Sequence, residues 1–493
     1  ACSRHDLIRF ALPGIRIEKR EAKPQHDLRS RKASRSVHIA KSDGALDHAY
    51  SLITSLSGKV LVIADTARSS SELIQLLTSQ KRMVLDLTSP LRVGELRERL
   101  TKARADNDVI VIGLRSSIFS SVGRVDHLVV INEWSEHHWE RQSPYWNTRD
   151  VALTRQEIEE NELHFIGDAI STELGRLLDI GYLTIRKAST RWVRSKKRSL
   201  TFSPNTYHRS ISEGLKSGPV LVSVAARNYV SSLLCARCRS KAICHCGGAM
   251  QEMSPSQYSC SICLRKENFL KCSECHGTKF LMLRKGAERI AEELGKAFPN
   301  IAIHKVNADS SPFIDAKKPS IVISTLGAEP RLSPKYAAAV LLDGELLANG
   351  ATLRSEEATW QRWWRIVGLL RTEAPIYISL PSEHTISQSI ASGSHQIFLH
   401  RTLAARKDSS LPPYSRMIEI SGDLSALRNL ALKLKEEITL PLEIYPLSSD
   451  GKLWIKSPID SAPSILKTLR VVQRYRSASK RELLAIKVDS YQI

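Results

Sequence analysis

The feature of this sequence that most limits its fold is a run of closely paired cysteines. Eight of the nine cysteines lie between positions 235 and 275. They form four pairs: Cys235/Cys238, Cys244/Cys246, Cys260/Cys263 and Cys272/Cys275. Three pairs have C-x-x-C spacing, which lets a tight turn direct two thiolates at one ion, and two such turns complete a tetrahedral zinc site. We therefore predict a module over residues 235–276 that binds two Zn²⁺ ions.

The number of cysteines does not determine which four of them bind each ion. Nested pairing puts the outer pairs on one ion and the inner pairs on the other, and sequential pairing is equally allowed. The second pair, Cys244 and Cys246, is one residue short of the usual spacing, so His245 is an alternative ligand for its ion. Redox chemistry needs only one C-x-x-C motif, and structural disulfides are rare in the cytosol. Cys2 lies far from the others and is expected to be a free thiol.

Charge points to a polyanionic partner. The chain has 72 Lys and Arg against 51 Asp and Glu, a net charge of +21, and such an excess favours nucleic acid. The basic residues gather in 1–36 and in 186–198. From the second cluster we predict a DNA-binding set, in which basic side chains contact phosphates and a tryptophan stacks on a base. The set is Arg191, Trp192, Arg194, Lys196 and Lys197. The alternative is a solvated loop with one packed tryptophan.

Length and apolar pattern indicate a multidomain protein of the cytoplasm. A chain of 493 residues suggests two to four domains. No apolar run approaches the roughly 18 residues of a membrane span, and the first residues lack the apolar segment of a signal peptide. We therefore expect no membrane partner.

Short apolar runs alternate with amphipathic segments on both sides of the cysteine module. Before it, the expected strands are 59–64, 108–113, 127–132 and 163–168, with a helix over 70–80. After it, we expect helices over 288–298 and 356–371 and strands over 320–327, 337–344 and 375–381. This alternation predicts two α/β lobes with parallel sheets. Residues 401–493 have a different, small α+β pattern.

Two such lobes on a basic chain suggest a nucleic-acid-dependent ATPase, but its motifs are absent. A phosphate loop reads G-x-x-x-x-G-K-[ST] after a strand. Gly58-Lys59 precedes its strand, and Gly44 is followed by Ala45 and Leu46. Where a magnesium-binding Asp is expected, the chain has Asn132, a neutral amide. Glu133 follows, and we interpret it as a loop carboxylate rather than half a metal site. No catalytic residue is predicted, and ATP binding is left in doubt.

The helix expected over 356–371 carries three tryptophans. Trp360, Trp363 and Trp364 have spacing that favours core or interlobe packing over base stacking. Arg362 and Arg365 on the same helix are expected on an exposed face, with phosphate contact as the alternative.

Several segments together resemble the PriA family of primosomal replication-restart proteins, in the helicase-degenerate form seen in actinobacteria. The resemblance runs from about residue 40 to 493. It is carried by "NYVSSLLCARCRSKAICHCGGAM", "CSICLRK" and "KCSECHG" in the cysteine module. "STLGAEP", "AAAVLLDGELL" and "LRSEEATWQRWWRIVGLLR" carry it in the second lobe, and "SLPPYSRM" near residue 410.

The resemblance implies a fold and a role. The fold is two degenerate helicase-like (RecA-like) lobes, with a two-zinc cysteine module inserted in the second and a small α+β domain at the end. The implied divisions are a basic leader at 1–36, lobe 1 at 37–180, lobe 2 at 181–234 and 277–400, the module at 235–276 and the C-terminal domain at 401–493. The resemblance also supports nested zinc pairing. Cys235, Cys238, Cys272 and Cys275 would hold one ion, and Cys244, Cys246, Cys260 and Cys263 the other.

The implied role is recognition of abandoned or stalled replication forks and promotion of primosome assembly and replicative-helicase loading. Forked or single-stranded DNA, single-strand-binding protein and a helicase loader would be the partners. The sequence departs from active relatives at Asn132 and at Gly368-Leu369-Leu370, where paired arginines are expected and Arg371 is out of step. Much of the family's N-terminal DNA-binding region is also missing, through truncation or loss. The alternatives are an ATP-dependent 3'-5' helicase with an unorthodox nucleotide site and a zinc-ribbon factor acting on RNA or transcription.

Overall fold

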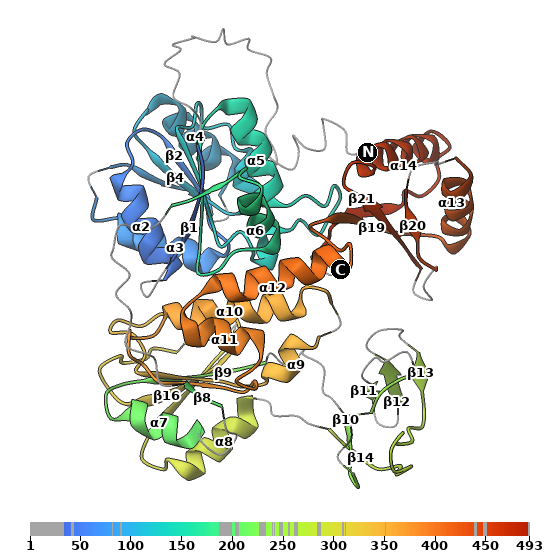
Figure 1. Ribbon diagram of the computed structural model, residues 1–493. Helices are drawn as coiled ribbons and strands as arrows, with labels where there is room; N and C mark the ends of the chain where they lie inside the picture. Colours follow the sequence, from blue (N-terminus) through green and yellow to red (C-terminus); the bar gives the residue numbers. More distant parts are fainter. Residues whose placement is uncertain are drawn as a thin grey trace.

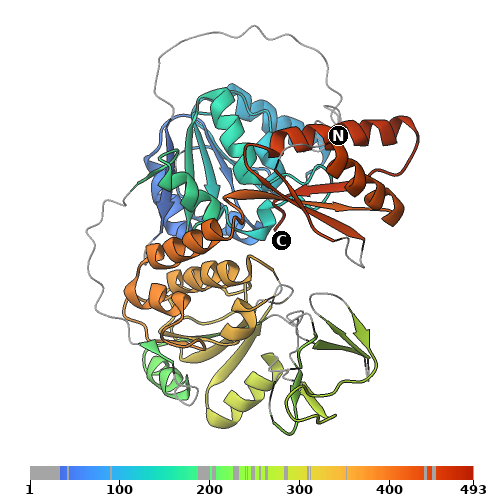
Figure 2. The same ribbon diagram turned by 45° about the vertical axis from the view of Figure 1, so that its right-hand side comes forward.

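The computed structural model describes most of the chain. The described residues are 34–40, 44–80, 82–88, 91–186, 200–202, 207–225, 233–238, 240, 242–245, 250–254, 257–260, 265–282, 287–307, 310, 312–350, 352–437, 441–446 and 451–491. They form two α/β lobes, a cysteine module and a C-terminal domain, which Figure 1 and Figure 2 show from two sides. Among these residues, no helix is both long enough and apolar enough to cross a membrane.

Lobe 1 is a seven-stranded sheet in which every pairing is parallel, in the order β3-β4-β2-β5-β6-β1-β7. Its strands are β1 (Arg35–Ile39), β2 (Val60–Ile63), β3 (Val84–Asp86), β4 (Ile110–Gly113), β5 (His127–Ile131), β6 (Glu162–Gly167) and β7 (Thr184–Ile185). Its helices are α2 (Ala45–Ser55), α3 (Ala67–Leu77), α4 (Val93–Ala105), α5 (Thr148–Glu159) and α6 (Thr172–Asp179), with short 3₁₀ helices at Arg115–Phe119 and Glu136–His138. The central strands β2, β4 and β5 are buried along their whole length, as expected when helices cover both faces.

Lobe 2 has a six-stranded sheet, again parallel throughout, in the order β15-β16-β9-β17-β18-β8. Its strands are β8 (Leu200–Thr201), β9 (Val220–Val224), β15 (Ala302–Val306), β16 (Ser320–Thr325), β17 (Ala338–Leu341) and β18 (Ile376–Ile378). Its helices are α7 (Tyr207–Leu215), α8 (Ala287–Ala297), α9 (Gly344–Ala348), α10 (Ser355–Gly368), α11 (Thr385–Ser392) and α12 (His395–Asp408). The prediction of two parallel-sheet lobes is confirmed.

The tryptophans of α10 lie in the buried core, where α10, α11 and α12 are stacked (Figure 1). Trp360 and Trp363 are fully buried, and Trp364 is nearly so. Trp360 stacks on Phe398 of α12 with ring centroids 4.4 Å apart, and its Nε1 donates to Ser389 Oγ at 3.0 Å. The prediction of core packing is confirmed.

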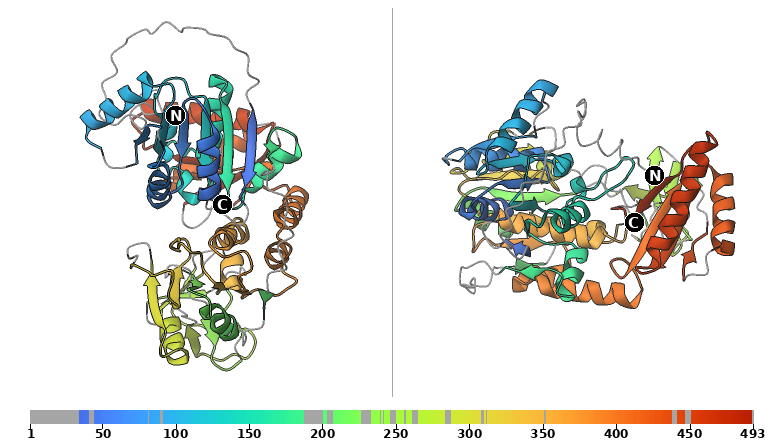
Figure 3. Two further views of the ribbon diagram at one scale, coloured as in Figure 1. Left: turned by 90° about the vertical axis from the view of Figure 1, so that its left-hand side faces the viewer. Right: turned by 90° about the horizontal axis from the view of Figure 1, so that it is seen from above.

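The cysteine module and the C-terminal domain are built on small antiparallel sheets. The module contains β10 (Leu233–Cys235), β11 (Met250–Ser254), β12 (Gln257–Cys260), β13 (Lys266–Glu267) and β14 (Phe280–Met282). The C-terminal domain contains β19 (Ser415–Ser421), α13 (Leu424–Glu437), β20 (Glu443–Ile444), β21 (Lys452–Pro458), α14 (Ala462–Ala478) and β22 (Ala485–Val488). Both helices lie on one face of that sheet, which Figure 3 shows from above in its right-hand view.

Several of the expected domain divisions fall inside structural units, and the one at 234/235 cuts β10 (Leu233–Cys235). The division at 180/181 separates β7 from the lobe 1 sheet, although β7 pairs with β1. The division at 400/401 cuts α12, which packs on α11 and α6 rather than on the C-terminal sheet. We therefore place the end of lobe 1 after β7 and the start of the C-terminal domain at β19.

Candidate functional site

The loop between β1 and α2 is where a motor protein of this topology would hold phosphate, and a carboxylate occupies that position. A helix N-terminus offers unpaired N–H groups and the positive end of the helix dipole to an anion. Here the N–H of Ala45, the first residue of α2, donates to Asp168 Oδ1 at 2.8 Å. Burial raises the pKa of Asp168 to about 7, although the nearby Arg365 acts to lower it. The side chain of Asp168 thus satisfies the group that a phosphate would contact.

Lobe 2 closes over the same position. A Cβ placed on Gly368, at the end of α10, would lie 3.1 Å from Gly44 Cα and 2.9 Å from Asp168 Oδ1. The cavity that remains among the described residues measures about 40 Å³. Small-molecule pockets usually measure roughly 300–1,000 Å³, whereas about 10–15 Å³ suffices for a water molecule. Among the described residues, the cavity lined by Gly44, Asp168 and Gly368 is far smaller than such a pocket.

The two residues after β5 have roles in holding lobe 1 together. Asn132 accepts from the backbone N–H of Asp168 at 3.3 Å and faces Asp65 Oδ2 at 3.5 Å. Glu133 accepts from the N–H of Ser171 at 2.7 Å and from its hydroxyl at 3.0 Å, at the N-cap of α6. Burial raises the pKa of Glu133 to about 7, against the opposing effect of Arg149. Glu133 is thus a buried helix-capping carboxylate within its loop.

Two basic residues considered from the sequence lie away from this position. Lys59 precedes β2, at the amino end of the sheet, and its Nζ donates to Val122 O at 2.9 Å. Arg371 donates to the carbonyl oxygens of Lys335 and Ser217 within lobe 2. Neither side chain is directed at the loop before α2.

The expectation of an exposed face for Arg362 and Arg365 is wrong, because both side chains cross to lobe 1. Arg362 pairs with Glu136 at 3.1 Å, and Arg365 Nη1 lies 3.6 Å from Asp65 Oδ2. Their side chains are only 16% and 21% exposed. The helical spacing that put the tryptophans on one face did not reveal that lobe 1 covers the opposite face.

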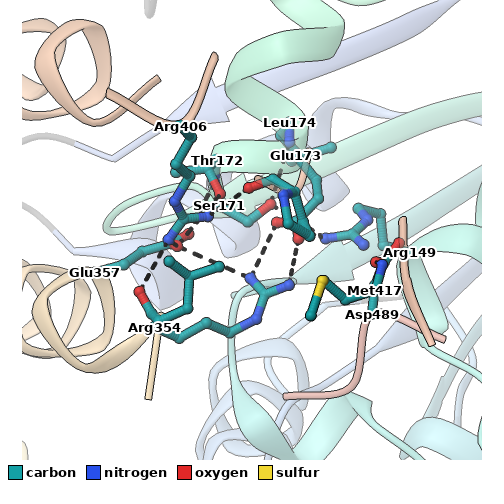
Figure 4. A network of polar contacts seen from close by, with 12 residues as sticks. Arg149, Ser171, Thr172, Glu173, Leu174, Arg354, Glu357, Arg406, Met417 and Asp489 are labelled. Carbon is teal, nitrogen blue, oxygen red and sulfur yellow. Dashed lines mark hydrogen bonds and ion pairs between the residues drawn. The ribbon is translucent and has the colours of Figure 1, made fainter. Parts of the chain in front are cut away.

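A buried network of charged residues joins the lobes beside this cleft (Figure 4). Arg354 of lobe 2 forms a bidentate ion pair with Glu173 of α6. Glu173 also forms an ion pair with Arg149 at 3.3 Å. Burial acts to raise the pKa of Glu173, but Arg354 and Arg149 hold it well below its usual range. Glu357 of α10 accepts from Thr172 N at 2.8 Å and from Arg406 Nη2 at 2.7 Å. Sequence reasoning missed this network, since nothing local marks its members as partners.

The outer cysteine pairs form a metal-ligand cluster. Strands β10 and β14 pair antiparallel, so the two C-x-x-C turns next to them meet. The sulfur atoms of Cys235, Cys238, Cys272 and Cys275 all lie within 4.8 Å of one another, with Cys235 to Cys275 at 3.4 Å and Cys238 to Cys272 at 3.5 Å. Zinc at roughly 2.3 Å from each sulfur would set them about 3.8 Å apart. These four residues therefore fit a zinc ion, and their arrangement is the nested one.

Space and polarity at this cluster also suit a metal. A Cβ on Gly277 would lie 3.2 Å from Cys235 Sγ, so glycine leaves room beside the thiolates. Hydrogen bonds from the Ser240 side chain and backbone lower the pKa of Cys238 to about 6. A thiolate at neutral pH is the form that binds metal.

The second predicted ligand set is only partly described. Cys244 and Cys260 are buried in one small apolar cluster of the module. Cys244 Sγ lies 3.2 Å from His245 Nδ1. Cys246 and Cys263 lie outside the described residues, so this site stays a prediction. The same is true of the predicted DNA-binding set, Arg191, Trp192, Arg194, Lys196 and Lys197, and of the leader up to residue 33.

The chain thus has two parallel-sheet α/β lobes, with the cysteine module inserted in the second. Among curated proteins, it is 27% identical to the probable replication restart protein PriA of Mycobacterium bovis, over 88% of this chain and 74% of that protein. It is 29% identical to the protein of that name in Mycobacterium leprae, over 74% of this chain and 59% of that one. The replication restart protein PriA of Bacillus subtilis is 22% identical over 66% of this chain and 45% of its own length.

These matches confirm the resemblance to PriA noted in the sequence: the chain's curated homologues are replication restart proteins of that name. Among solved structures, it is similar to RecG bound to a three-way DNA junction, with 11% identity, 76% of this chain and 44% of that chain covered, and a TM-score of 0.42. It is also similar to S. cerevisiae Dbp5 bound to RNA and ADP BeF3, with 10% identity, 74% and 83% covered, and a TM-score of 0.39. No family model matches the chain.

Proposed function

We propose that this chain is a DNA-binding replication-restart protein of the cytoplasm, which recognises abandoned or stalled forks and promotes primosome assembly and replicative-helicase loading without helicase activity of its own. Similarity to PriA proteins supports the role. The observation that carries the absence of a motor is the closed phosphate position, where Asp168 caps α2 and Gly368 packs on Gly44.

The physical reason is that a motor must open and close its lobes around ATP. Phosphoryl transfer depends on positioned cations that neutralise charge on the phosphates, and here the first residue of α2 is Ala45. Opening the lobes would also separate buried ions, among them Arg354 from Glu173. A buried charge that loses its partner destabilises the structure by about 3–5 kcal/mol. The network therefore favours one fixed arrangement of the two lobes.

Helix α14 has an exposed basic face in the part of the chain that the structure describes. Its sequence contains no acidic residue. Lys467, Arg470 and Arg474 are exposed at helical spacing, and Val471 and Tyr475, which follow Arg470 and Arg474 in the chain, are 58% and 64% exposed. Positive charge beside an exposed aromatic ring is complementary to phosphate and base. We propose that this face contacts DNA together with the basic cluster at 186–198.

The metal module is part of the same proposal. Cys235, Cys238, Cys272 and Cys275 would hold one structural Zn²⁺, and Cys244, Cys246, Cys260 and Cys263 a second. The module and the C-terminal domain would recognise the shape of the fork. Single-strand-binding protein and a helicase loader would be the protein partners.

The experiment that tests the function compares binding of forked, duplex and single-stranded DNA, with and without ATP. We expect preference for the fork, no change with ATP, and ATP hydrolysis at background with every DNA. DNA-stimulated hydrolysis or strand separation would favour the alternative of an unorthodox helicase.

The α14 surface is tested by replacing Lys467, Arg470 and Arg474 with Gln. The plot of log affinity against log salt should flatten by about 0.9 for each phosphate of duplex DNA that the variant no longer neutralises. A matched control makes the same charge change on the exposed residues Arg428, Lys433 and Lys435 of the neighbouring helix α13. Equal effects from both variants would mean that net charge, and not this face, governs binding.

The 186–198 cluster is tested in the same assay with a fourfold alanine variant. The replaced residues are Arg191, Arg194, Lys196 and Lys197. We expect weaker binding to all sequences, because phosphate contacts carry no base information. An unchanged salt slope in the folded variant would remove the cluster from the binding surface.

A further inference from the structure

A second group of metal-ligating side chains lies in lobe 1, at the end of the sheet opposite the closed phosphate position. His127 is the first residue of β5 and Glu162 the first residue of β6, and the two are direct neighbours in the parallel register. His164 lies two residues after Glu162, so its side chain shares that face of the sheet. His127 and His164 are buried, and the side chain of Glu162 is 28% exposed.

The three ligand atoms form a nearly regular triangle. His127 Nδ1 lies 3.3 Å from His164 Nε2, and Glu162 Oε2 lies 3.6 Å and 3.8 Å from these nitrogens. A point equidistant from all three lies about 2.1 Å from each, within the roughly 2.0–2.2 Å typical of zinc bonded to His and carboxylate ligands. The atoms therefore already have a spacing that one transition-metal ion requires.

His164 presents its Nε2 to this point, and its Nδ1 has a hydrogen-bond partner on the other side of the ring. Its Nδ1 lies 2.9 Å from Ser36 Oγ, and that hydroxyl has an acceptor of its own in Leu163 O at 3.3 Å. If Nδ1 donates to Ser36, Nε2 carries the lone pair that faces His127 and Glu162. Metal-binding histidines usually have such an outer hydrogen bond, which orients the ring and sets its tautomer.

We propose that His127, Glu162 and His164 bind one divalent transition-metal ion, of the zinc, cobalt or nickel type, separately from the cysteine module. Two imidazoles and one carboxylate suit these metals better than calcium or magnesium, which prefer oxygen ligands. The exposed edge of Glu162 leaves the remaining coordination position open to water. Arg186 adds positive charge near His164, so we expect weaker binding than at the four cysteines.

The test uses the full chain with its cysteine sites already filled with zinc, titrated with Co²⁺ and followed by visible absorption and calorimetry. We expect one further Co²⁺ per chain, with visible ligand-field bands and no thiolate charge-transfer band. Glu162→Gln, which changes a partly exposed side chain, should weaken this binding at least about tenfold. Ser36→Ala should weaken it by about 10- to 100-fold, the range for loss of an outer-shell partner.

The matched control is His48→Gln. His48 belongs to the same group of histidines through its contact with His38 at 3.4 Å, but it lies outside the triangle. It should leave Co²⁺ binding unchanged. Absence of a further Co²⁺ in the folded parent chain would overturn the proposal, as would unchanged affinity in Glu162→Gln. The three residues would then form only a hydrogen-bonded group.

Discussion

Glu357→Gln is the sharpest test of the idea that the lobes form one fixed unit. Glu357 is 2% exposed and accepts from Thr172 N, across the lobe boundary, and from Arg406 Nη2. Glutamine keeps the shape and the acceptor oxygen but removes the charge. Arg406 then loses its ion-pair partner, and Arg354 loses one of two, since Glu173 remains. Removing one partner of a buried ion pair lowers the stability of the folded state by about 3–5 kcal/mol.

The assay is hydrogen exchange of the backbone amides of α6 and α10, which the Thr172–Glu357 hydrogen bond joins across the boundary. Loss of that free energy should accelerate exchange there by about 10²- to nearly 10⁴-fold, because roughly 1.4 kcal/mol corresponds to a factor of ten. Glu356→Gln on the same helix is the control, since Glu356 is 43% exposed and its partner His384 is 3.8 Å away. Its effect should stay within about 0.5 kcal/mol. Equal exchange in the two variants, or fast exchange of α6 in the parent chain, would refute the fixed-unit interpretation.

Three further predictions concern metal, pH and packing. Cys235→Ser should unfold the module and lower the zinc content per chain by elemental analysis while the lobes stay folded, whereas Cys2→Ser should leave zinc content unchanged. Burial raises the pKa of Asp168 from an ordinary 3.8 to about 7 in the folded chain. The contribution of its protonated side chain to the free energy of unfolding is therefore fully present below pH 4. It is lost as pH rises to 7, which lowers the free energy of unfolding by roughly 4 kcal/mol. In thermal unfolding, Asp168→Asn should therefore become progressively more stable than the parent chain between pH 4 and 7. The same dependence of stability on pH in the variant and the parent would contradict this. Trp363→Ala should cost about 3–5 kcal/mol because the side chain is fully buried; a change within about 0.5 kcal/mol in chemical denaturation would show that the interlobe core tolerates the loss.

Much of the framework could be predicted from the sequence because its signals are local. The apolar runs at 59–64 and 127–132 became β2 and β5, since a strand buried on both faces needs consecutive apolar residues. Helical spacing alone placed Trp360 and Trp363 in the core. The C-x-x-C pairs indicated metal ligands, because two thiolates on one turn are already close to the geometry of a tetrahedral ion.

What only the tertiary structure decided is which distant residues meet. Antiparallel pairing of β10 with β14 brings Cys235 and Cys238 to Cys272 and Cys275, a choice that spacing had left open. Packing of the lobes turned Arg365 from an expected surface residue into a partner of Asp65. Thr172 and Glu357 stand 185 residues apart in the chain yet share a hydrogen bond. Such contacts depend on which faces of separately folded elements come together, and the periodicity of a single element does not indicate which face another element will cover.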